Sequence, residues 1–463
     1  HFNKPFNSLI NKSVNLGINF FLKRNKFLIK KMSTPTKKVA FHTLGCKLNF
    51  SETSSISRNF ITHGYEKVGI REFADIYVIN TCSVTENANK ETRKLIRRSK
   101  RINTNAIIVV TGCYAQLKPD ELMNVDGVNM VIGAEEKFNL LKHLDRLLLS
   151  SEKKLMLKSN INEVKKYEPS YSTNDRTRSF LKVQDGCNYH CTFCTIPKAR
   201  GSSRSQTIKQ TIQVAKQLAE TGTKEIVLTG VNIGDFGSGS NESFYDLIVN
   251  LDKIKGIERF RISSIEPNLL YDEIIDFCAK SEKFMPHFHI PLQSGSDKIL
   301  RSMGRRYDKV EFSNRINMIK SLIPDACIGV DVIVGFPSET EEDFMETYHL
   351  IDQLDISYLH VFTYSERENT KALKINPVVP IHERISRSKR LHKLSDKKRK
   401  LFYDNFIGEK KYTLFESFKN GELVGHTDNY IKIHVNGDTS LINTIQRVNI
   451  LNRKNEYMIG QIN

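Results

Sequence analysis

Six short apolar runs follow one another between Ser179 and Ser365, and helical stretches separate them. Each run leads into a polar or glycine-rich turn, and the runs are FLKVQ, EIVLTG, RFRISS, HFHIPL, IGVDVIVGF and YLHVFTY. Strands that alternate with helices in this way form a parallel sheet. We therefore expect an α/β fold over residues 177–402, in which the six repeats form an incomplete barrel related to the eight-stranded kind. In such folds the chemistry gathers at the carboxyl ends of the strands.

A second pattern occurs three times earlier in the chain: an apolar strand ends in a small-residue turn that contains a cysteine. The instances are KVAFHTLGC, ADIYVINTC and AIIVVTGC, which end at Cys46, Cys82 and Cys113. Helical segments lie between them, so residues 38–150 are expected to form a parallel βαβ domain. Right-handed crossovers bring the strand ends to one edge, about 4.8 Å apart, so the three thiols can converge on one site. The alternative is three buried free thiols, which are common in cores.

The remaining segments predict a linker, a second small domain and an extension. Residues 151–176 are polar and read as the linker. Residues 403–463 contain short strands with turn signals, which is typical of a small antiparallel β-barrel of the kind that often holds oligonucleotides. Residues 1–37 are expected to be a non-native or disordered extension, with Met32 as the natural start. A transit peptide is the alternative, although the Arg-rich and Ser-rich amphipathic pattern is missing.

The positive charge of the chain is concentrated in two places. The 463 residues include 70 Lys and Arg against 52 Asp and Glu, a formal net charge of +18. Residues 1–31 contain seven basic side chains and no acidic one, and residues 384–400 contain nine against one Asp. With Leu391, Leu394 and Leu401 at helical spacing, the second run predicts an amphipathic helix with a basic outer face. That face is either simply solvated or binds a polyanion such as RNA.

Eight cysteines occur in a chain that has no secretory signal, which indicates a reducing compartment, here the cytoplasm. No apolar run approaches the roughly 20 residues of a membrane span. Three cysteines form Cys187-x3-Cys191-x2-Cys194 directly after the first of the six runs. Three thiolates from one loop can hold three irons of a four-iron, four-sulfur cluster and leave the fourth iron open. A zinc site is the alternative, although the neighbours of His190, the nearest further ligand, would pull it away.

The octapeptide CNYHCTFC after the first strand of a six-repeat barrel resembles the signature of the radical S-adenosylmethionine superfamily. The three domains in this order resemble the methylthiotransferases of that superfamily, over nearly all of residues 38–463. The motifs that carry the resemblance are TLGCKLN (43–49), NTCSVTENA (80–88), GCYAQ (112–116), IPKARGSSRS (196–205), HIPLQSGSDKILRSMGRRY (289–307) and DVIVGFPSETEEDF (331–344). They are most similar to the branch acting on N6-threonylcarbamoyladenosine at position 37 of tRNA. The branches acting on isopentenyladenosine in tRNA and on an aspartate of ribosomal protein S12 rank second and third.

The resemblance implies two four-iron, four-sulfur clusters and two uses of S-adenosylmethionine. Cys187, Cys191 and Cys194 would ligate the cluster that cleaves the cofactor to a radical, while Cys46, Cys82 and Cys113 would ligate an auxiliary cluster. One cofactor molecule would donate a methyl group to a sulfur on the auxiliary cluster, and the radical from a second would activate C2 of the adenine. An external electron donor, a sulfur donor and an exposed anticodon loop of tRNA are implied partners. Nothing in the sequence suggests more than a monomer.

Further residues are expected to bind the cofactor or RNA. For the cofactor we expect positions at the strand ends, although each could instead be a cap or turn former: Gly230, Asn232, Glu266, Gln293, Ser294 and Gly335. For tRNA phosphates we expect basic residues around the mouth and on the predicted helix: Arg200, Arg204, Arg305, Arg306, Lys397, Lys398, Arg399 and Lys400. The C-terminal barrel would be the TRAM-like RNA-binding domain of the family. A non-enzymatic RNA-binding protein with structural or redox-sensing clusters remains an alternative.

Overall fold

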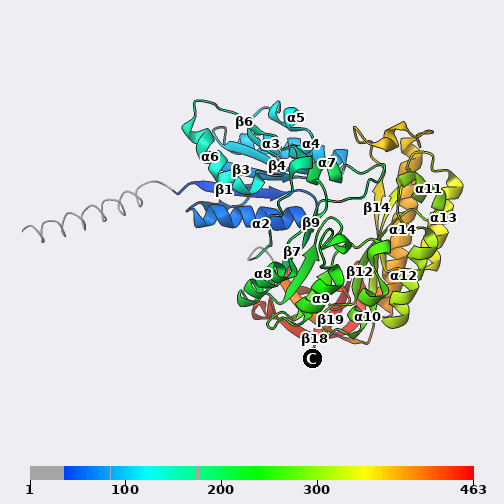
Figure 1. Ribbon diagram of the computed structural model, residues 1–463. Helices are drawn as coiled ribbons and strands as arrows, with labels where there is room; N and C mark the ends of the chain where they lie inside the picture. Colours follow the sequence, from blue (N-terminus) through cyan, green and yellow to red (C-terminus); the bar gives the residue numbers. More distant parts are fainter. Residues whose placement is uncertain (1–35, 84, 174–176) are drawn as a thin grey trace, which may run out of the picture.

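The computed structural model describes residues 36–83, 85–173 and 177–463. Nearly all of the expected extension, residues 1–37, lies outside these ranges. The described chain forms a parallel N-terminal sheet, an open barrel and a small closed barrel, as Figure 1 shows in blue to cyan, green to yellow, and orange to red. The predicted fold class is confirmed in this order of domains.

The N-terminal domain is built on six parallel strands in the order β2-β1-β3-β4-β5-β6. Their bounds are β1 (Lys38–Thr43), β2 (Glu66–Val68), β3 (Ile76–Thr81), β4 (Ile107–Gly112), β5 (Val128–Ile132) and β6 (Leu155–Leu157). Helices cover both faces, as parallel sheets require. They are α2 (Lys47–Thr62), α3 (Glu86–Ile102), α4 (Cys113–Leu117), α5 (Pro119–Met123), η1 (Lys137–Asn139) and α6 (Leu140–Leu149).

Alternate residues of these strands enter two separate apolar cores. Tyr77 and Ile79 of β3 pack with Leu95 and Ile96 of α3 on one face. Val78, between them in the sequence, packs on the other face with residues of α2 and α6. This alternation is the period of two that a strand buried on both sides shows.

The predicted linker is wrong in one respect. Strand β6 lies within residues 151–176 and pairs in parallel with β5, so the N-terminal sheet extends to Leu157. The segment then continues through η2 (Ile161–Glu163) toward the barrel. The three residues Leu-Met-Leu are too few for sequence periodicity to reveal a strand. Only the pairing with β5 defines β6.

The central domain is the predicted six-stranded open barrel. Its strands are β7 (Arg178–Lys182), β10 (Glu225–Thr229), β11 (Arg259–Ile262), β12 (His287–Gln293), β13 (Cys327–Val334) and β14 (Tyr358–Thr363). They pair in parallel within the groups β11-β10-β7 and β12-β13-β14. Isolated parallel bridges Phe260–Phe284 and Ser264–His289 join the two groups at β11 and β12.

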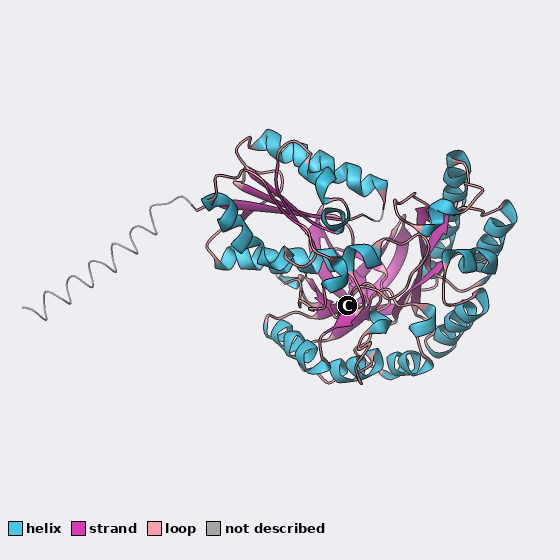
Figure 2. Cartoon of the chain, turned by 45° about the horizontal axis from the view of Figure 1, so that its top comes forward, coloured by secondary structure: helices cyan, strands magenta, loops and turns pink. Residues whose placement is uncertain are grey.

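Helices line the outside of this curved sheet, and Figure 2 shows them as an arc around the strands. They are α8 (Ile208–Glu220), α9 (Phe244–Asp252), α10 (Asp272–Lys280), α11 (Asp297–Met303), α12 (Lys309–Leu322), α13 (Glu341–Gln353) and α14 (Ile381–Asp404). Three of them begin with a capping box, formed by Thr207 with Gln210, Ser243 with Asp246, and Thr340 with Asp343. Such boxes satisfy the first free N–H groups of a helix and fix where it starts.

Short elements connect these helices and strands at the ends of the barrel. They are β8 (Gln184–Asp185), α7 (Ile196–Arg200), β9 (Arg204–Ser205), η3 (Ile233–Asp235), η4 (Pro267–Leu269) and η5 (Lys371–Lys374). The loop between β8 and α7 contains the cysteine motif that follows the first barrel strand.

Five strands close the C-terminal barrel in the order β15-β16-β17-β19-β18. They are β15 (Lys410–Lys419), β16 (Glu422–Thr427), β17 (Lys432–Val435), β18 (Ile445–Lys454) and β19 (Tyr457–Ile462), with η6 (Thr439–Leu441) before β18. The expectation of a fully antiparallel barrel is wrong at one seam, because β17 and β19 pair in parallel. A whole strand, β18, lies between them in the sequence, so they run in the same direction.

Candidate functional site

The loop after β8 holds three free thiols, two of which accept backbone N–H groups. The N–H of Tyr189 donates to Sγ of Cys187 at 3.3 Å, and the N–H of Ile196 donates to Sγ of Cys194 at 3.4 Å. Burial raises the pKa of Cys187 to about 11 and that of Cys194 to about 12. These thiols therefore keep their protons at neutral pH unless a metal replaces them.

Arg305, which follows α11, completes the surroundings of this loop. Its guanidinium donates to Sγ of Cys191 at 3.2 Å and forms an ion pair with Glu266. Only 5% of the Arg305 side chain is exposed. The expectation that Arg305 holds a tRNA phosphate is therefore wrong, because Nε, Nη1 and Nη2 of the guanidinium all bond to groups inside the protein.

The other three cysteines lie at the carboxyl ends of the neighbouring strands β1, β3 and β4. Cys46 precedes α2, Cys82 follows β3, and Cys113 is the first residue of α4. A Cβ on Gly45 would lie 2.9 Å from Sγ of Cys82, so glycine is needed for this close approach. Burial raises the pKa of the Cys113 thiol, and the neighbouring Arg200 opposes that rise. The structure thus brings the three cysteines to one edge of the sheet, as the strand pattern predicted.

A buried network of charges joins the N-terminal domain to the barrel beside these cysteines. Glu52 of α2 binds Lys137 at 2.6 Å and Arg200 at 3.0 Å, while Asp185 binds Arg200 at 2.9 Å and Lys182 at 3.4 Å. Burial alone would raise the pKa of Glu52, but the cations, Arg200 foremost, lower it to about 2. Arg200 is fully paired here, so the expectation that it contacts tRNA is wrong.

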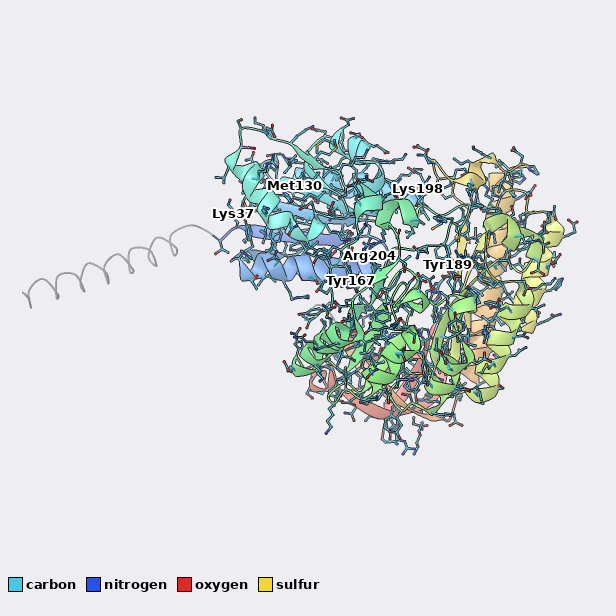
Figure 3. All side chains as sticks on the ribbon, viewed as in Figure 1. Lys37, Met130, Tyr167, Tyr189, Lys198 and Arg204 are labelled. Carbon is cyan, nitrogen blue, oxygen red and sulfur yellow. The ribbon has the colours of Figure 1, made fainter. Side chains whose placement is uncertain are left out.

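The same junction includes Tyr167 and Arg204, which Figure 3 labels between the N-terminal domain and the barrel. The hydroxyl of Tyr167 donates to the carbonyl of Lys182 at 2.5 Å. Arg204 pairs with Asp185 at 3.2 Å and donates to the carbonyl of Arg200 at 2.6 Å. Arg204 is therefore also bonded to residues of this junction rather than to a phosphate.

A cavity of about 890 Å³, the main cavity, lies where the three domains meet. Its lining includes Cys46 and Cys82 from the first domain, barrel residues such as His289, and Tyr430 from the C-terminal barrel. A smaller pocket of about 240 Å³ is lined by Cys194 and Gln293. The two share Thr85, Asp331 and Phe362 in their walls, so Cys46 and Cys82 of one group and Cys194 of the other line adjoining spaces.

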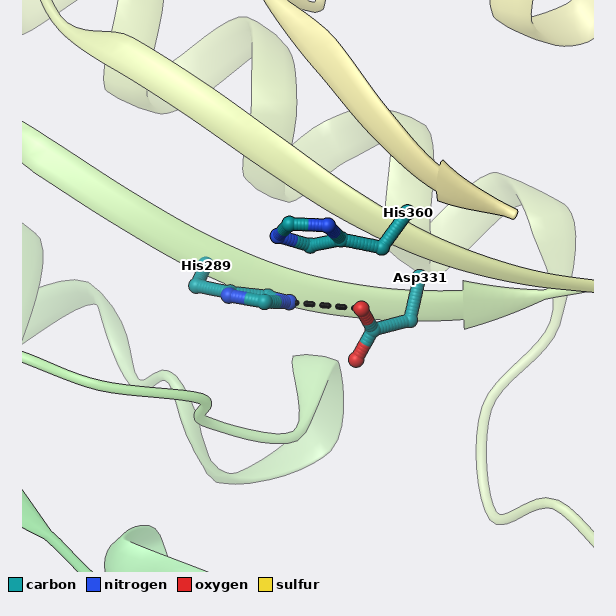
Figure 4. Close-up of side chains that lie close together, drawn as sticks. All are labelled: His289, Asp331 and His360. Carbon is teal, nitrogen blue, oxygen red and sulfur yellow. Dashed lines mark hydrogen bonds and ion pairs between the residues drawn. The ribbon is translucent and has the colours of Figure 1, made fainter. Parts of the chain in front are cut away.

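Three polar side chains that the sequence analysis did not single out project into the main cavity. Nε2 of His289 is hydrogen-bonded to Oδ1 of Asp331 at 2.8 Å. The ring of His360 stacks on that of His289 with 5.1 Å between the ring centroids (Figure 4). Their ligand atoms lie within 4.8 Å of one another, but the rings stack rather than converge on one point. They come from three adjacent strands, and the signal was a polar residue at an alternate position in each apolar run.

Comparisons with known proteins place the chain in a family. Residues 38–133 match the Uncharacterized protein family UPF0004, and residues 181–351 match the Radical SAM superfamily. Threonylcarbamoyladenosine tRNA methylthiotransferase MtaB of Bacillus subtilis is 42% identical, over 91% of this chain and 96% of that protein. The protein of the same name from Aquifex aeolicus is also 42% identical, over 86% and 97%. The chain belongs to the radical S-adenosylmethionine methylthiotransferases.

More distant similarities agree with this family. The tRNA-2-methylthio-N(6)-dimethylallyladenosine synthase of Protochlamydia amoebophila is 30% identical, over 92% of this chain and 96% of that protein. The solved structure of the radical S-adenosylmethionine methyltransferase TsrM of Kitasatospora setae superposes with a TM-score of 0.52 at 12% identity, over 71% and 73% of the two chains. The latter similarity concerns the fold alone.

The described residues fit the iron–sulfur cluster and the cofactor of a radical S-adenosylmethionine enzyme. The cysteine loop offers thiols with N–H donors, which is the surrounding that iron–sulfur thiolates have. His190 is exposed, so the loop offers three ligands and leaves a position open. Asn232 is 3% exposed, and neither its amide oxygen nor its amide nitrogen has a hydrogen-bond partner. A buried amide of this kind calls for a polar ligand.

The other residues expected to bind the methylthiotransferase cofactor have different surroundings. A Cβ on Gly230 would lie 3.0 Å from the carbonyl of Gln184, whose side-chain oxygen accepts the N–H groups of Val231 and Asn232, each at 2.9 Å. Glycine here lets the turn that presents Asn232 approach β8. Gln293 has a φ of 64° at the end of β12 and lines the pocket beside Cys194.

Three further residues expected at the cofactor have contacts within the protein, and their contact with the cofactor stays a prediction. Ser294 is buried, accepts the N–H of Ser296 at 3.2 Å and bonds Thr347 at 3.3 Å, so its hydroxyl serves the turn. Glu266 forms an ion pair with Arg305 through one carboxylate oxygen, Oε2. Gly335 faces α14, since a Cβ there would lie 2.3 Å from Cγ of Arg384.

The basic outer face expected for α14 is only partly present. Arg384, Arg387 and Lys398 of α14 are buried, and Nζ of Lys398 donates to the carbonyls of Asp352 and Leu354 at 2.5 and 2.7 Å. Leu401, expected on the apolar side, is 54% exposed. The expectation that Lys398 contacts tRNA is therefore wrong.

Other cations remain accessible to a polyanion. Lys397, Arg399 and Lys400 line a groove of about 350 Å³ between α14 and the C-terminal barrel, and Arg453 of β18 lies on its other wall. Arg306 is exposed and lies 4.0 Å from the ring centre of Tyr189, beside the cysteine loop. No helix within the described ranges has the length and apolar character that crossing a bilayer requires.

Proposed function

We propose that this protein is a tRNA-modifying enzyme that converts N6-threonylcarbamoyladenosine at position 37 into its 2-methylthio derivative. The observation that carries the proposal is the pair of cysteine groups on adjoining cavities, with Asp331 in the wall between them. A reaction that joins sulfur to an unreactive ring carbon needs both groups near one base. The names of the two relatives that are 42% identical support the substrate.

The protein's own residues bind, orient and enclose. Cys187, Cys191 and Cys194 would hold one four-iron, four-sulfur cluster, and Cys46, Cys82 and Cys113 the second. When bound, the clusters and S-adenosylmethionine supply the electron, the radical and the methyl group. Asn232 would bind polar atoms of the cofactor through the unpaired oxygen and nitrogen of its amide. No general acid–base pair is required, because an aromatic C–H bond does not yield to proton transfer at neutral pH.

RNA would bind across the second and third domains. The groove beside α14 presents Lys397, Arg399 and Lys400, and Arg306 adds a charge at the cysteine loop. Phosphate contacts of this kind supply affinity and orientation without reading sequence. An anticodon loop already presents unpaired bases that can be splayed into a cavity.

Further partners follow from the reaction class. An external reductant must deliver electrons to the clusters, and a sulfur donor must replace the sulfur that each turnover consumes. The free thiols of the described residues fit a reducing compartment such as the cytoplasm, and we expect a monomer there.

Mass spectrometry of tRNA nucleosides from a deletion strain tests the proposal. We expect 2-methylthio-threonylcarbamoyladenosine to disappear, its precursor to accumulate, and the gene to restore the product. Unchanged product would contradict the proposal. Loss of the 2-methylthio isopentenyl nucleoside, or of the modified aspartate in ribosomal protein S12, would instead identify one of the two sister reactions. Anaerobic protein with both clusters that forms no deoxyadenosine with reductant would favour a non-enzymatic RNA-binding role.

A further inference from the structure

Lys47 occupies an unusual place between two cavities. It follows Cys46 directly and begins α2, and it lines both the main cavity and a basic side pocket of about 190 Å³. The walls of the side pocket also include Arg178, Arg261 and Tyr430. Among the residues that the structure describes, none forms a hydrogen bond or ion pair with the ammonium of Lys47.

The arginines beside Lys47 are paired with carboxylates, whereas Lys47 itself has no such partner among the described residues. Arg178 pairs with Glu416 at 3.1 Å, and Arg261 pairs with Glu225 at 2.8 Å. Lys47, Arg178 and Arg261 line the side pocket, and no carboxylate is among the described residues that line it. Asp331, in the wall of the main cavity, is hydrogen-bonded to His289 at 2.8 Å and forms no ion pair with Lys47. Each arginine of the pocket thus has its own carboxylate, and Lys47 is the cation there that a bound anion would neutralise.

The arginines themselves are already fixed, which leaves Lys47 as the adaptable cation. Arg261 donates from its Nη atoms to the carbonyls of Asp428 and Thr427 at 2.7 and 2.8 Å. It thereby fastens the C-terminal barrel to the central one. An ammonium on a flexible stem, in contrast, can adjust to a ligand group.

Stacked rings give the pocket a rigid wall. The ring of Tyr430 stacks on His287 at 4.3 Å and on His426 at 4.8 Å between centroids. Tyr430 has a φ of 68°, a left-handed backbone conformation that a tyrosine adopts only when its surroundings hold it there. The wall opposite Lys47 is thus preorganised rather than mobile.

We propose that Lys47 and the basic side pocket form an anion subsite that takes the carboxylate of the threonylcarbamoyl group on the target adenine. The inference rests on the proposed function and deepens it. Threonine linked through its nitrogen to a carbamoyl group keeps a free carboxylate, and the subsite lies beside Cys46, where the same base must react. An uncharged dimethylallyl group would leave the ammonium desolvated and unpaired, so the subsite also selects against that substrate.

The test uses the enzyme with both clusters reconstituted and two anticodon stem-loops. One carries the natural carboxylate, and the other carries the threoninamide, which has the same shape without the charge. The dissociation constant from fluorescence anisotropy and kcat/KM for the 2-methylthio product are measured for each. We expect the wild-type protein to favour the acid roughly 10-fold or more, as a charge-assisted hydrogen bond provides.

Variants then assign the preference to Lys47. K47Q and K47M are expected to lose most of the preference, because they bind the acid stem-loop more weakly and the amide stem-loop about equally well. K47R is expected to retain the preference. K432Q is the matched control, because Lys432 lines the main cavity but not the side pocket, and it is expected to keep the wild-type preference. Iron and sulfide contents report whether each variant loads its clusters.

Several results would overturn the inference. One is equal binding of the acid and the amide stem-loops by the wild-type protein, a result that needs no variant. Another is an equal loss of affinity for both stem-loops in K47Q. A raised KM for inorganic sulfide in K47Q with the acid preference intact would assign the subsite to the sulfur donor instead. Tighter binding of the acid without any 2-methylthio product would uphold the subsite and contradict the proposed function.

Discussion

Arg305 is the single residue on which the charge balance around the cysteine loop depends. It is buried between Sγ of Cys191 and the carboxylate of Glu266, and its guanidinium stands over the ring of Tyr307 at 5.0 Å. A cation in this position offsets the negative charge of a thiolate cluster and of Glu266 together. Without it, two anionic groups would remain buried side by side.

Replacing Arg305 by Gln should therefore weaken the cluster of this loop. We expect the iron content of R305Q to fall toward that of a variant lacking the three loop cysteines, and deoxyadenosine formation to fall with it. Iron analysis and electron paramagnetic resonance of the reduced protein measure this loss. R306Q is the control, since Arg306 is exposed. Full iron loading in R305Q would show that Arg305 is dispensable for the cluster.

Gly112 permits the turn that presents Cys113. Its φ is 95°, and an added Cβ would lie 2.4 Å from both Oδ1 of Asn80 and the carbonyl oxygen of Thr81. We expect G112A to lower the free energy of unfolding by about 2–5 kcal/mol, through strain and a backbone clash. Urea unfolding followed by circular dichroism measures it.

Gly222 gives the matched control for that prediction. Its φ is 79°, yet nothing lies within 4 Å of an added Cβ. G222A should therefore cost about 1–2 kcal/mol from backbone strain alone. Equal losses in the two variants would mean that the close neighbours of Gly112 are unimportant.

The cysteines of the site could be predicted from the sequence, whereas the roles of its arginines could not. A spacing of three and two residues, or a cysteine after each strand, is a local pattern that implies geometry. Arg200 and Arg305 were expected at phosphates because a positive charge near a site mouth suits RNA. Their actual partners, Glu52 and Glu266, are 148 and 39 residues away in the chain. Charge alone does not reveal whether a carboxylate of the fold or an external phosphate will pair with it.

Among the elements, α14 shows the same limit on a larger scale. Three cations of its expected basic outer face, Arg384, Arg387 and Lys398, lie in the interior instead. Arg384 donates to the carbonyl of Val379 at 2.8 Å, and Arg387 pairs with Glu339 at 2.7 Å. These acceptors lie outside the helix, so the helical spacing of leucines could not predict them. The existence and approximate span of the helix were nevertheless predictable from its periodicity.

The three cations of α14 that line the groove beside the C-terminal barrel predict a salt-dependent effect. Replacing Lys397, Arg399 and Lys400 by Gln should weaken tRNA binding and reduce the slope of log K against log salt by about 1 for each phosphate that is no longer neutralised. Cleavage of S-adenosylmethionine without tRNA should persist. Filter binding at several salt concentrations measures the slope.

K398Q is the control that distinguishes the loss of a charge from the loss of structure in that experiment. K398Q removes the same charge but deletes two buried hydrogen bonds to carbonyls. It should lower thermal stability and leave the salt slope unchanged. An unchanged slope in the triple variant would mean that the exposed face of α14 is only solvated.

The contact of α2 with the barrel should be sensitive to acid. The pKa of Glu52 is lowered from 4.5 to about 2, so its stabilisation is present above about pH 4.5 and is lost as the pH falls toward 2. E52Q should remove this dependence and cost about 3–5 kcal/mol at neutral pH, because Arg200, Lys137 and Lys182 lose their shared anion. The first unfolding transition in urea, measured across pH, tests both. A variant as stable as the wild type would contradict the assigned charge balance.

For the whole molecule, the order of three domains and both barrel types could be predicted from the sequence. The alternation of strands and helices decides these features locally. The main cavity could not be predicted, because its walls come from Cys46, His289 and Tyr430, which belong to three different domains. Strand β6 and the parallel seam of β17 with β19 were missed for the same reason, since only distant pairing defines them.

The C-terminal barrel should be necessary for the stability of the central domain as well as for RNA binding. Arg259 and Arg261 of β11 are buried and donate to carbonyls of Tyr412, Thr427 and Asp428 in that barrel. A chain ending at residue 408 should therefore be poorly soluble and bind little iron. Expression and iron analysis test this. A soluble truncated protein with full iron and only weaker tRNA binding would contradict it.

The seam between β17 and β19 also sets an order of events during synthesis. β19 is the last strand described, and it pairs with β17 on one side and β18 on the other. Every cysteine of the two groups leaves the ribosome at least 260 residues before this strand, which completes the C-terminal barrel. Domains fold from the N-terminus as they emerge. The cysteine groups therefore emerge before the C-terminal barrel that later adjoins them can close.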